Sequence, residues 1–218
     1  SRPSVKWVVE TTGRINDSAP TIVDGTVYIG TWGKYLYAID AESGTVQWTD
    51  NNEIVSTGPI VIADTVYYVI VDDSQLHALD AETGKTKWTY KSDKADNKLT
   101  VTEPSGFGET VYVGTGELGG ADLTGQEVHA VNADTGNREW KTEVYEPVAT
   151  APTATAESVF VLADDVLLAL DPETGTRNWT YNMPGESNNV DPAPVVGNGF
   201  VYACTDSDGL CAVDAETG

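Results

Sequence analysis

Residues 114–119 read Gly-Thr-Gly-Glu-Leu-Gly, a spacing that could bind the phosphates of a dinucleotide. Such a site needs a helix directly after the glycines, because the amides at the helix N-terminus bind the pyrophosphate. An expected strand precedes the glycines at residues 111–113, but residues 120–125 read Gly-Ala-Asp-Leu-Thr-Gly, a turn-rich loop. We therefore interpret the segment as a loop between two strands and reject a dinucleotide site.

Two further groups have side chains that bind metals. Residues 205–209 read Thr-Asp-Ser-Asp-Gly, which makes Asp206 and Asp208 weak calcium candidates. A calcium loop also needs a third aspartate and a distant bidentate glutamate, so a tight hairpin is favoured here. His77 and His129 take equivalent positions in a repeat and have no Cys or His neighbours to complete a zinc set, which favours packing. No nucleophile can be placed beside either histidine, and no catalytic residue is predicted.

The two cysteines flank an expected hairpin loop. Cys204 and Cys211 could face each other across two paired strands. A bridge would close only a short loop and add little stability, but it would indicate an oxidising compartment. The sequence leaves open whether the two are bonded.

The elements that position these residues are repeats. The pattern Ala-x-Asp-x-x-x-Gly-x-x-x-Trp recurs, and its successive tryptophans are 40, 52 and 39 residues apart. The fifth copy stops at its glycine, and residues 4–7 (Ser-Val-Lys-Trp) read like the strand that should follow. The expected structural positions are Asp40, Gly44 and Trp48, Asp80, Gly84 and Trp88, Asn132, Gly136 and Trp140, Asp171, Gly175 and Trp179, Asp214, Gly218 and Trp7.

Each repeat contains short β-branched and aromatic runs of period two, separated by Asp-Gly or Asn-Gly turns. Four such strands per repeat of about 40 residues predict the blades of an all-β propeller. We expect one domain over residues 1–218, with repeats at approximately 19–48, 59–88, 104–140, 152–179 and 194–218 plus 4–10. Five four-stranded antiparallel blades would close into a ring when the N-terminal strand completes the last blade, removing two sheet edges. The alternative is part of a longer array.

The recurring residues have a physical role in such blades. The aspartate can accept hydrogen bonds from amides just downstream, and the glycine can adopt the left-handed conformation that closes the turn. A tryptophan four residues later can lie against the turn of the neighbouring blade, where its burial contributes about 2–3 kcal/mol. Asn132 suits the same turn, because an asparagine oxygen accepts the same bonds.

The sequence has a large excess of acidic over basic residues. The chain has 12 Lys and Arg against 34 Asp and Glu, a net charge of −22, spread through every segment. This charge would repel the phosphates of a nucleic acid, so we expect no such partner. No apolar run is long enough for a membrane helix. A uniformly acidic, lysine-poor surface indicates a halophilic organism, where dense salt screens the repulsion; a cation-binding role is the alternative.

The repeated motif resembles the tryptophan-docking motif of the pyrroloquinoline quinone (PQQ)-like repeat family of β-propellers, over nearly all 218 residues. The resemblance implies a propeller, and an extracytoplasmic or cell-surface location. It does not fix an activity, because the family includes quinoprotein dehydrogenases, an outer-membrane assembly scaffold and sensor domains. A dehydrogenase would need eight blades, PQQ, calcium and an aspartate base, and no residue here can be matched to the last two. We therefore predict no cofactor, with PQQ and calcium as the alternative.

Loops on a rigid scaffold are where binding usually occurs, and one face of the propeller should gather them. Our first hypothesis is a non-catalytic, monomeric module that presents this acidic face to a protein or small-molecule partner; the alternative is a PQQ-dependent dehydrogenase or part of one. The candidate face residues are Trp32, Tyr35, Asp72, Asp73, Glu117, Asp122, Asp164 and Asp165.

Overall fold

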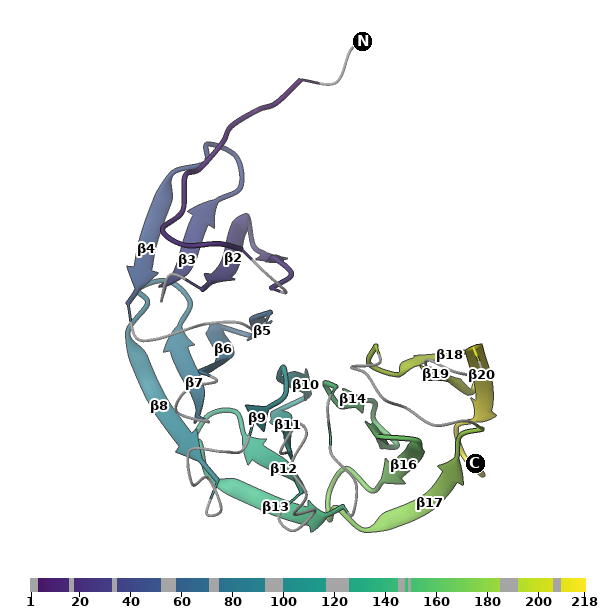
Figure 1. Ribbon diagram of the computed structural model, residues 1–218. Coiled ribbons are helices and arrows are strands. Elements are labelled where there is room, and N and C mark those ends of the chain that lie inside the picture. The colour runs from purple at the N-terminus through teal and green to yellow at the C-terminus, as the bar shows by residue number, and fades with distance from the viewer. Residues whose placement is uncertain are drawn as a thin grey trace.

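The computed structural model describes residues 4–15, 18–32, 35–51, 58–70, 75–92, 100–116, 126–144, 148, 150–184, 192–205 and 209–218. In these ranges the chain is all-β, with twenty strands in five sheets, as predicted. The sheets follow one another around an arc, each as one propeller blade (Figure 1). None of the described residues forms a helix able to cross a membrane.

Each blade is an antiparallel meander with strands in chain order. Blade one holds β1 (Thr21–Val23), β2 (Thr26–Thr31), β3 (Tyr35–Asp40) and β4 (Val46–Asp50). Blade two holds β5 (Ile60–Ile62), β6 (Thr65–Ile70), β7 (Gln75–Asp80) and β8 (Thr86–Lys91). Blade three holds β10 (Ser105–Phe107), β11 (Thr110–Gly116), β12 (Glu127–Asn132) and β13 (Arg138–Glu143), with β9 (Thr100–Val101) paired to the end of β11. Blade four holds β14 (Thr153–Ala154), β15 (Val159–Ala163), β16 (Val166–Leu170) and β17 (Arg177–Asn182), and blade five holds β18 (Val195–Gly197), β19 (Phe200–Thr205) and β20 (Gly209–Asp214).

The two-residue turn sequences between strands explain the hairpins. Asp24 and Gly25 join β1 to β2 with φ of 47° and 76°, and Asn198 and Gly199 join β18 to β19 with φ of 54° and 80°. Two left-handed residues give a turn whose twist matches that of the paired strands. The third and fourth strands of every four-stranded blade also share a shift of register directly after the motif alanine, as at Ala38. This bulge turns the end of the third strand into the motif turn.

The core is divided among the junctions between blades. Between blades one and two, Leu36 and Ala38 pack with Val66 and Tyr68, all buried. The same arrangement recurs at each later junction. The apolar faces of each sheet are therefore packed against the neighbouring blades. A sheet with two apolar faces would not be stable if both were exposed to water.

The recurring tryptophans lie at these junctions. Each indole Nε1 donates to the backbone carbonyl of the residue after the motif Asp or Asn in the following blade. The pairs are Trp48 to Ala81 at 2.9 Å, Trp88 to Ala133 at 2.9 Å, Trp140 to Pro172 at 2.9 Å and Trp179 to Ala215 at 3.2 Å. The motif glycine faces the ring, so a Cβ at Gly84 would come within 2.8 Å of Trp48.

The motif aspartates organise the turns on which the indoles rest. Asp171 Oδ1 accepts the amide and the hydroxyl of Thr174, each at 2.8 Å. The hydroxyl bond of Thr174, followed by its amide bond, lowers the pKa of Asp171 below its ordinary value. Asp40, Asp80 and Asp214 have lowered pKa values from the corresponding bonds.

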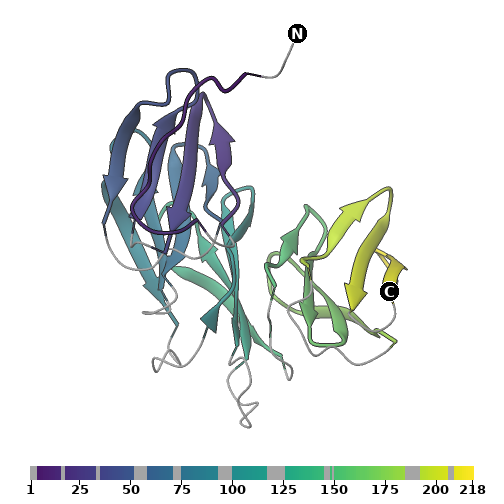
Figure 2. The ribbon, with the colours of Figure 1, turned by 45° about the horizontal axis from the view of Figure 1, so that its top comes forward.

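The N-terminal segment lies against blade one. Trp7 Nε1 donates to the carbonyl of Ala41 at 3.0 Å, and a Cβ at Gly44 would lie 2.7 Å from the Trp7 ring. Trp7 thus contacts blade one as the last strand of a preceding blade would. Blade five has three strands among the described residues, and Figures 1 and 2 both show an opening between blades one and five. The expected pairing of residues 4–10 with β20 is not shown, and closure of the ring stays a prediction.

A candidate binding groove between blades three and four

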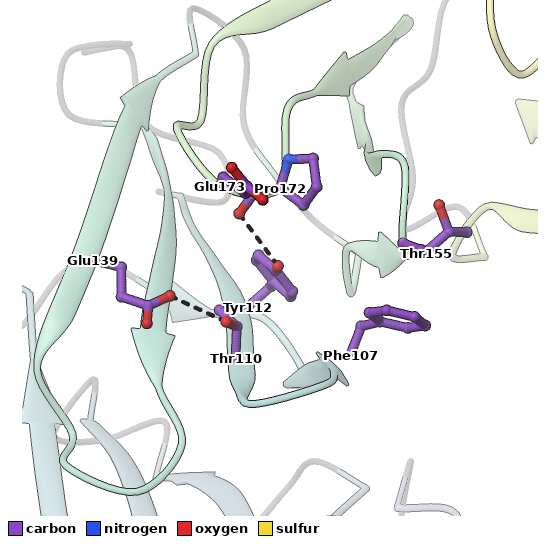
Figure 3. Close-up of a pocket in the computed structure, with 8 residues that line it drawn as sticks. Phe107, Thr110, Tyr112, Glu139, Thr155, Pro172 and Glu173 are labelled. Atoms are coloured by element: carbon purple, nitrogen blue, oxygen red, sulfur yellow. Dashed lines mark hydrogen bonds between the residues drawn. The ribbon is translucent and has the colours of Figure 1, made fainter.

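A groove of about 490 Å³ lies where blade three meets blade four (Figure 3). We call it the blade 3–4 groove. It is formed by the turn between β10 and β11, the outer strand β13, and two turns of blade four. Its lining residues are Phe107, Thr110, Tyr112, Glu139, Thr155, Ala156, Pro172 and Glu173.

Aromatic side chains from blade three contribute an apolar part of the groove. Phe107 ends the short innermost strand β10 and is 47% exposed, a large fraction for a phenylalanine. Tyr112 on β11 is buried, and its ring lies 5.8 Å from that of Trp140. The Tyr112 hydroxyl points to the Pro172 carbonyl at 3.5 Å, and burial raises the pKa of Tyr112 above its ordinary value. The phenol therefore stays protonated at neutral pH.

Two carboxylates lie at the other end of the groove from Phe107. Glu139 Oε2 accepts the Thr110 hydroxyl at 3.0 Å, and Glu139 Oε1 accepts the Asn132 side-chain amide at 3.1 Å. Glu173 lies beside Pro172 in the motif turn of blade four, and both glutamates are on the other side of Tyr112 from Phe107 (Figure 3). Both glutamates are exposed, and neither forms an ion pair with a described lysine, arginine or histidine.

Asn132 explains how Glu139 is held. Its Oδ1 accepts the amide and hydroxyl of Thr135 at 3.0 Å each, as the motif aspartates do in the other repeats. Its Nδ2 also donates to Glu139, which an aspartate could not do. An aspartate here would instead place a second negative carboxylate next to Glu139, and the two would repel each other. The one departure from Asp in the motif therefore orients a carboxylate of the groove.

The equivalent surfaces at the other junctions have different charges. The residue before the docking tryptophan is Gln47, Lys87 or Asn178 where blade three has Glu139. At the second junction, Lys87 Nζ lies 2.9 Å from Asp64 Oδ1 and 2.7 Å from Thr65 Oγ1. In blade three the matching positions are Glu109, Thr110 and Glu139. The chain itself thus places a cation on this surface in blade two and carboxylates alone in blade three.

A network of buried polar side chains lies at a different junction, between blades two and three. Glu127 and His129 are fully buried on β12, with Glu127 Oε2 3.1 Å from His129 Nε2. Lys141 Nζ lies 2.9 Å from Glu127 Oε1, and the Tyr90 hydroxyl of blade two lies 2.8 Å from His129 Nδ1. A buried carboxylate needs such partners to offset its desolvation. This polar network therefore links blades two and three.

The remaining sequence candidates have these positions. His77 is buried, with its ring 5.3 Å from that of Tyr68. Cys204 lies opposite Leu210, and Cys211 lies opposite Ala203, at adjacent positions of the β19–β20 ladder. Adjacent positions point to opposite faces of a sheet, so the expectation that the cysteines face each other is wrong, and both are free. The described residues contain no group of three or more His, Cys, Asp or Glu side chains able to hold a metal ion; the calcium candidates Asp206 and Asp208 lie outside them.

The predicted loop face is described only in part. Trp32 is 48% exposed, and its amide donates to the Arg14 carbonyl at 2.9 Å. The Tyr35 ring lies 5.7 Å from that of Tyr37, and Asp164 and Asp165 form the tight turn between β15 and β16. Asp72, Asp73, Glu117 and Asp122 lie outside the described residues. The blade 3–4 groove is at the opposite ends of the strands, because the turns after first and third strands share one side of an antiparallel meander.

Sequence reasoning missed the groove residues Phe107, Glu139 and Glu173. They are far apart along the chain: strand pairing places Phe107 and Glu139 in blade three, and the stacking of blade four brings Glu173 to them. A signal was nevertheless present, since aligning the repeats shows a phenylalanine at 107 where the other blades have Val23, Ile62, Thr155 and Gly197.

The repeats match one protein family over residues 4–127 and again over residues 101–218, and the family is described as outer membrane protein assembly factor BamB, a PQQ-like repeat family. The chain belongs to this family. No curated protein matches the sequence significantly.

Solved structures share its fold. BamB from Moraxella catarrhalis is 21% identical, with a TM-score of 0.69, over 95% of this chain and 59% of that one. Quinohemoprotein alcohol dehydrogenase from Comamonas testosteroni is 21% identical, with a TM-score of 0.75, over 96% of this chain and 42% of that one. The computationally designed Ika8 protein is 15% identical, with a TM-score of 0.70, over 89% of this chain and 57% of that one. The chain therefore spans 42–59% of the length of these relatives.

Proposed function

We propose that this chain is a non-catalytic propeller module that binds a protein partner. Its recurring tryptophans, glycines and aspartates are all occupied in joining blades or closing turns, as the bonds of Trp88 and Asp171 illustrate. That packing produces a rigid scaffold with variable surface positions between the blades. Proteins commonly bind through such positions on a rigid frame.

The observation that carries this proposal is the blade 3–4 groove. Phe107 presents about half of its surface to solvent inside a hollow of about 490 Å³. An aromatic side chain in a concave surface is the usual anchor of a protein interface, because its burial gives much area at little entropic cost. The acidic loop face around Trp32 is the second candidate surface of the same module.

The charge supports an origin in a salt-rich environment. A net charge of −22 on 218 residues destabilises the folded state unless ions screen it. We propose that the protein is halophilic. We also propose an extracytoplasmic or cell-surface location, supported by the description of its family as an outer membrane protein assembly factor.

The alternative is a PQQ-dependent dehydrogenase, which the fold shared with the quinohemoprotein enzyme suggests. The described residues do not gather the carboxylates of a calcium site, so they do not fit the cofactor set, and we derive no reaction step through it. This alternative predicts a visible absorbance change with PQQ and calcium, and dye reduction with an alcohol or sugar.

A photo-crosslinking amino acid tests the proposal. It is placed at Phe107 in one variant and at Trp32 in another, since both side chains are about half exposed. We expect the Phe107 variant to crosslink one protein in cells, and the purified partner to bind the chain and to lose binding to Phe107→Thr. Crosslinking at Trp32 alone would move the site to the loop face, and PQQ-dependent dye reduction would overturn the non-catalytic function.

A further inference from the structure

We propose that the blade 3–4 groove binds an arginine in an extended basic segment of a partner protein. This inference rests on the proposed function and names the chemistry of its partner. The groove combines the exposed ring of Phe107 with the carboxylates of Glu139 and Glu173, which lie on the other side of Tyr112 from Phe107 (Figure 3). An arginine fits this combination, because its aliphatic stem packs on apolar surface while its guanidinium donates to carboxylates.

The carboxylates are set up to accept hydrogen bonds. Glu139 is oriented by Thr110 and Asn132, each donating to a different carboxylate oxygen at about 3 Å. Neither donor is charged, so both leave the negative charge of Glu139 uncompensated. Every carboxylate oxygen has more than one lone pair, so Glu139 can accept a guanidinium while it keeps these two bonds.

The comparison between blades supports a cation as the occupant. At the junction of blades two and three, Lys87 supplies a positive charge within 2.9 Å of Asp64 and 2.7 Å of Thr65. The corresponding threonine of blade three, Thr110, donates to Glu139 instead. The first and fourth junctions have neutral Gln47 and Asn178 at the position of Glu139. Only the third junction has a glutamate at this position together with a glutamate in the next motif turn, and both line the groove.

The occupant is a protein segment, because the lining of the groove extends past the two carboxylates. Thr155 and Ala156 of blade four also line it, and Thr155 lies on the same side of Tyr112 as Phe107, away from Glu139 (Figure 3). An extended peptide places alternate side chains on one face, about 7 Å apart. An arginine at the carboxylates therefore leaves its second neighbour, an apolar residue, near Phe107.

The test uses a fluorescein-labelled hexapeptide of sequence Arg-Ser-Leu-Ser-Arg-Ser, in which leucine is the second neighbour of each arginine, and a matched peptide with citrulline for arginine. Citrulline keeps the planar shape but lacks the charge. Binding is measured by anisotropy at 0.15 M and 1 M KCl, with folding checked by circular dichroism at both concentrations. We expect the arginine peptide to bind at least about tenfold more tightly than the citrulline peptide, as for loss of a charge-assisted contact.

Matched variants separate the groove from the general acidity. Glu139→Gln with Glu173→Gln, and Glu42→Gln with Glu82→Gln, both change the net charge from −22 to −20. Glu42 and Glu82 occupy the place of Glu173 in the motif turns of blades one and two. The groove variant should weaken arginine-peptide binding about tenfold, and the control variant less than about twofold. Phe107→Thr, which copies Thr155 of blade four, should also weaken it.

Equal effects of the two glutamine variants would mean non-specific attraction to an acidic surface and would overturn the inference. Equal binding of arginine and citrulline peptides would do the same. Either result, combined with crosslinking of a partner at Phe107, would reject the arginine while leaving the protein-binding function standing. If arginine-specific binding and crosslinking at Phe107 were both absent, the arginine inference and the protein-binding function of the groove would both be rejected.

Discussion

Alanine at Gly136 gives a quantitative test of how indoles join the blades. Gly136 has φ of +70°, and a Cβ there would lie 2.6 Å from Trp88 Cδ2. Carbon atoms pack at about 3.5–4.0 Å, so the ring must move. Gly25 is the matched control, because its φ is +76° and no atom lies within 4 Å of its Cβ position.

The two substitutions share the strain of a left-handed alanine, about 1–2 kcal/mol. Gly25→Ala should lower the free energy of unfolding by that amount alone. Gly136→Ala should cost about 1–3 kcal/mol more, because it overpacks the junction. Trp88→Ala by itself should cost about 3–5 kcal/mol, since it removes a large side chain and the bond from Nε1 to the Ala133 carbonyl.

The double variant isolates the contact. With the indole removed by Trp88→Ala, Gly136→Ala should cost only the strain seen at Gly25, giving a coupling of about 1–3 kcal/mol. The assay is urea denaturation at fixed KCl, followed by far-UV circular dichroism and checked for a constant m-value. If Gly136→Ala cost no more than Gly25→Ala, or kept its extra cost without the indole, the contact would not join the blades as described.

Three further outcomes follow from the same structure. The midpoint of urea denaturation should rise between 0.1 and 2 M KCl, because screening relieves the repulsion of a net charge of −22; a flat or falling midpoint would contradict the halophilic origin. The lowered pKa of Asp171 stabilises the fold above the ordinary aspartate pKa of about 3.9, and this stability is lost as the pH falls through the lower folded pKa. Asp171→Asn, which copies the turn of blade three, should therefore lose less stability than the parent from pH 5 to pH 2.5, and an unchanged pH profile would refute the role of this carboxylate. Trp7→Ala should speed hydrogen exchange of the amides of β3 and β4, because Trp7 contacts Gly44 and donates to Ala41; unchanged exchange there would show that the contact adds no stability.

The fold was predictable from the sequence because the pattern repeats. Period-two runs such as residues 26–31, with Asp24 and Gly25 before them, specify strands and tight hairpins through local chemistry alone. The family matched over the whole chain agrees with that prediction. The bulge after Ala38 was not predicted, because it depends on how the third and fourth strands pair and not on any one residue type.

The groove was not predictable in the same way. Phe107 and Glu173 are separated by more than a whole repeat, and their nearness depends on how blade four stacks on blade three. Turn residues such as Asp164 were predicted to bind a partner because loops usually carry function, whereas the groove lies at the other ends of the strands. Departures within a repeat, such as Asn132 and Glu139, are the signal that sequence reasoning can use.

A crystal structure of the chain with the arginine–leucine hexapeptide tests the central claim most directly. The account predicts peptide between blades three and four, with a guanidinium hydrogen-bonded to Glu139 or Glu173 and a leucine on Phe107, while the indole of Trp140 keeps its bond to Pro172. Peptide bound at the loop face around Trp32, with an empty groove, would contradict it.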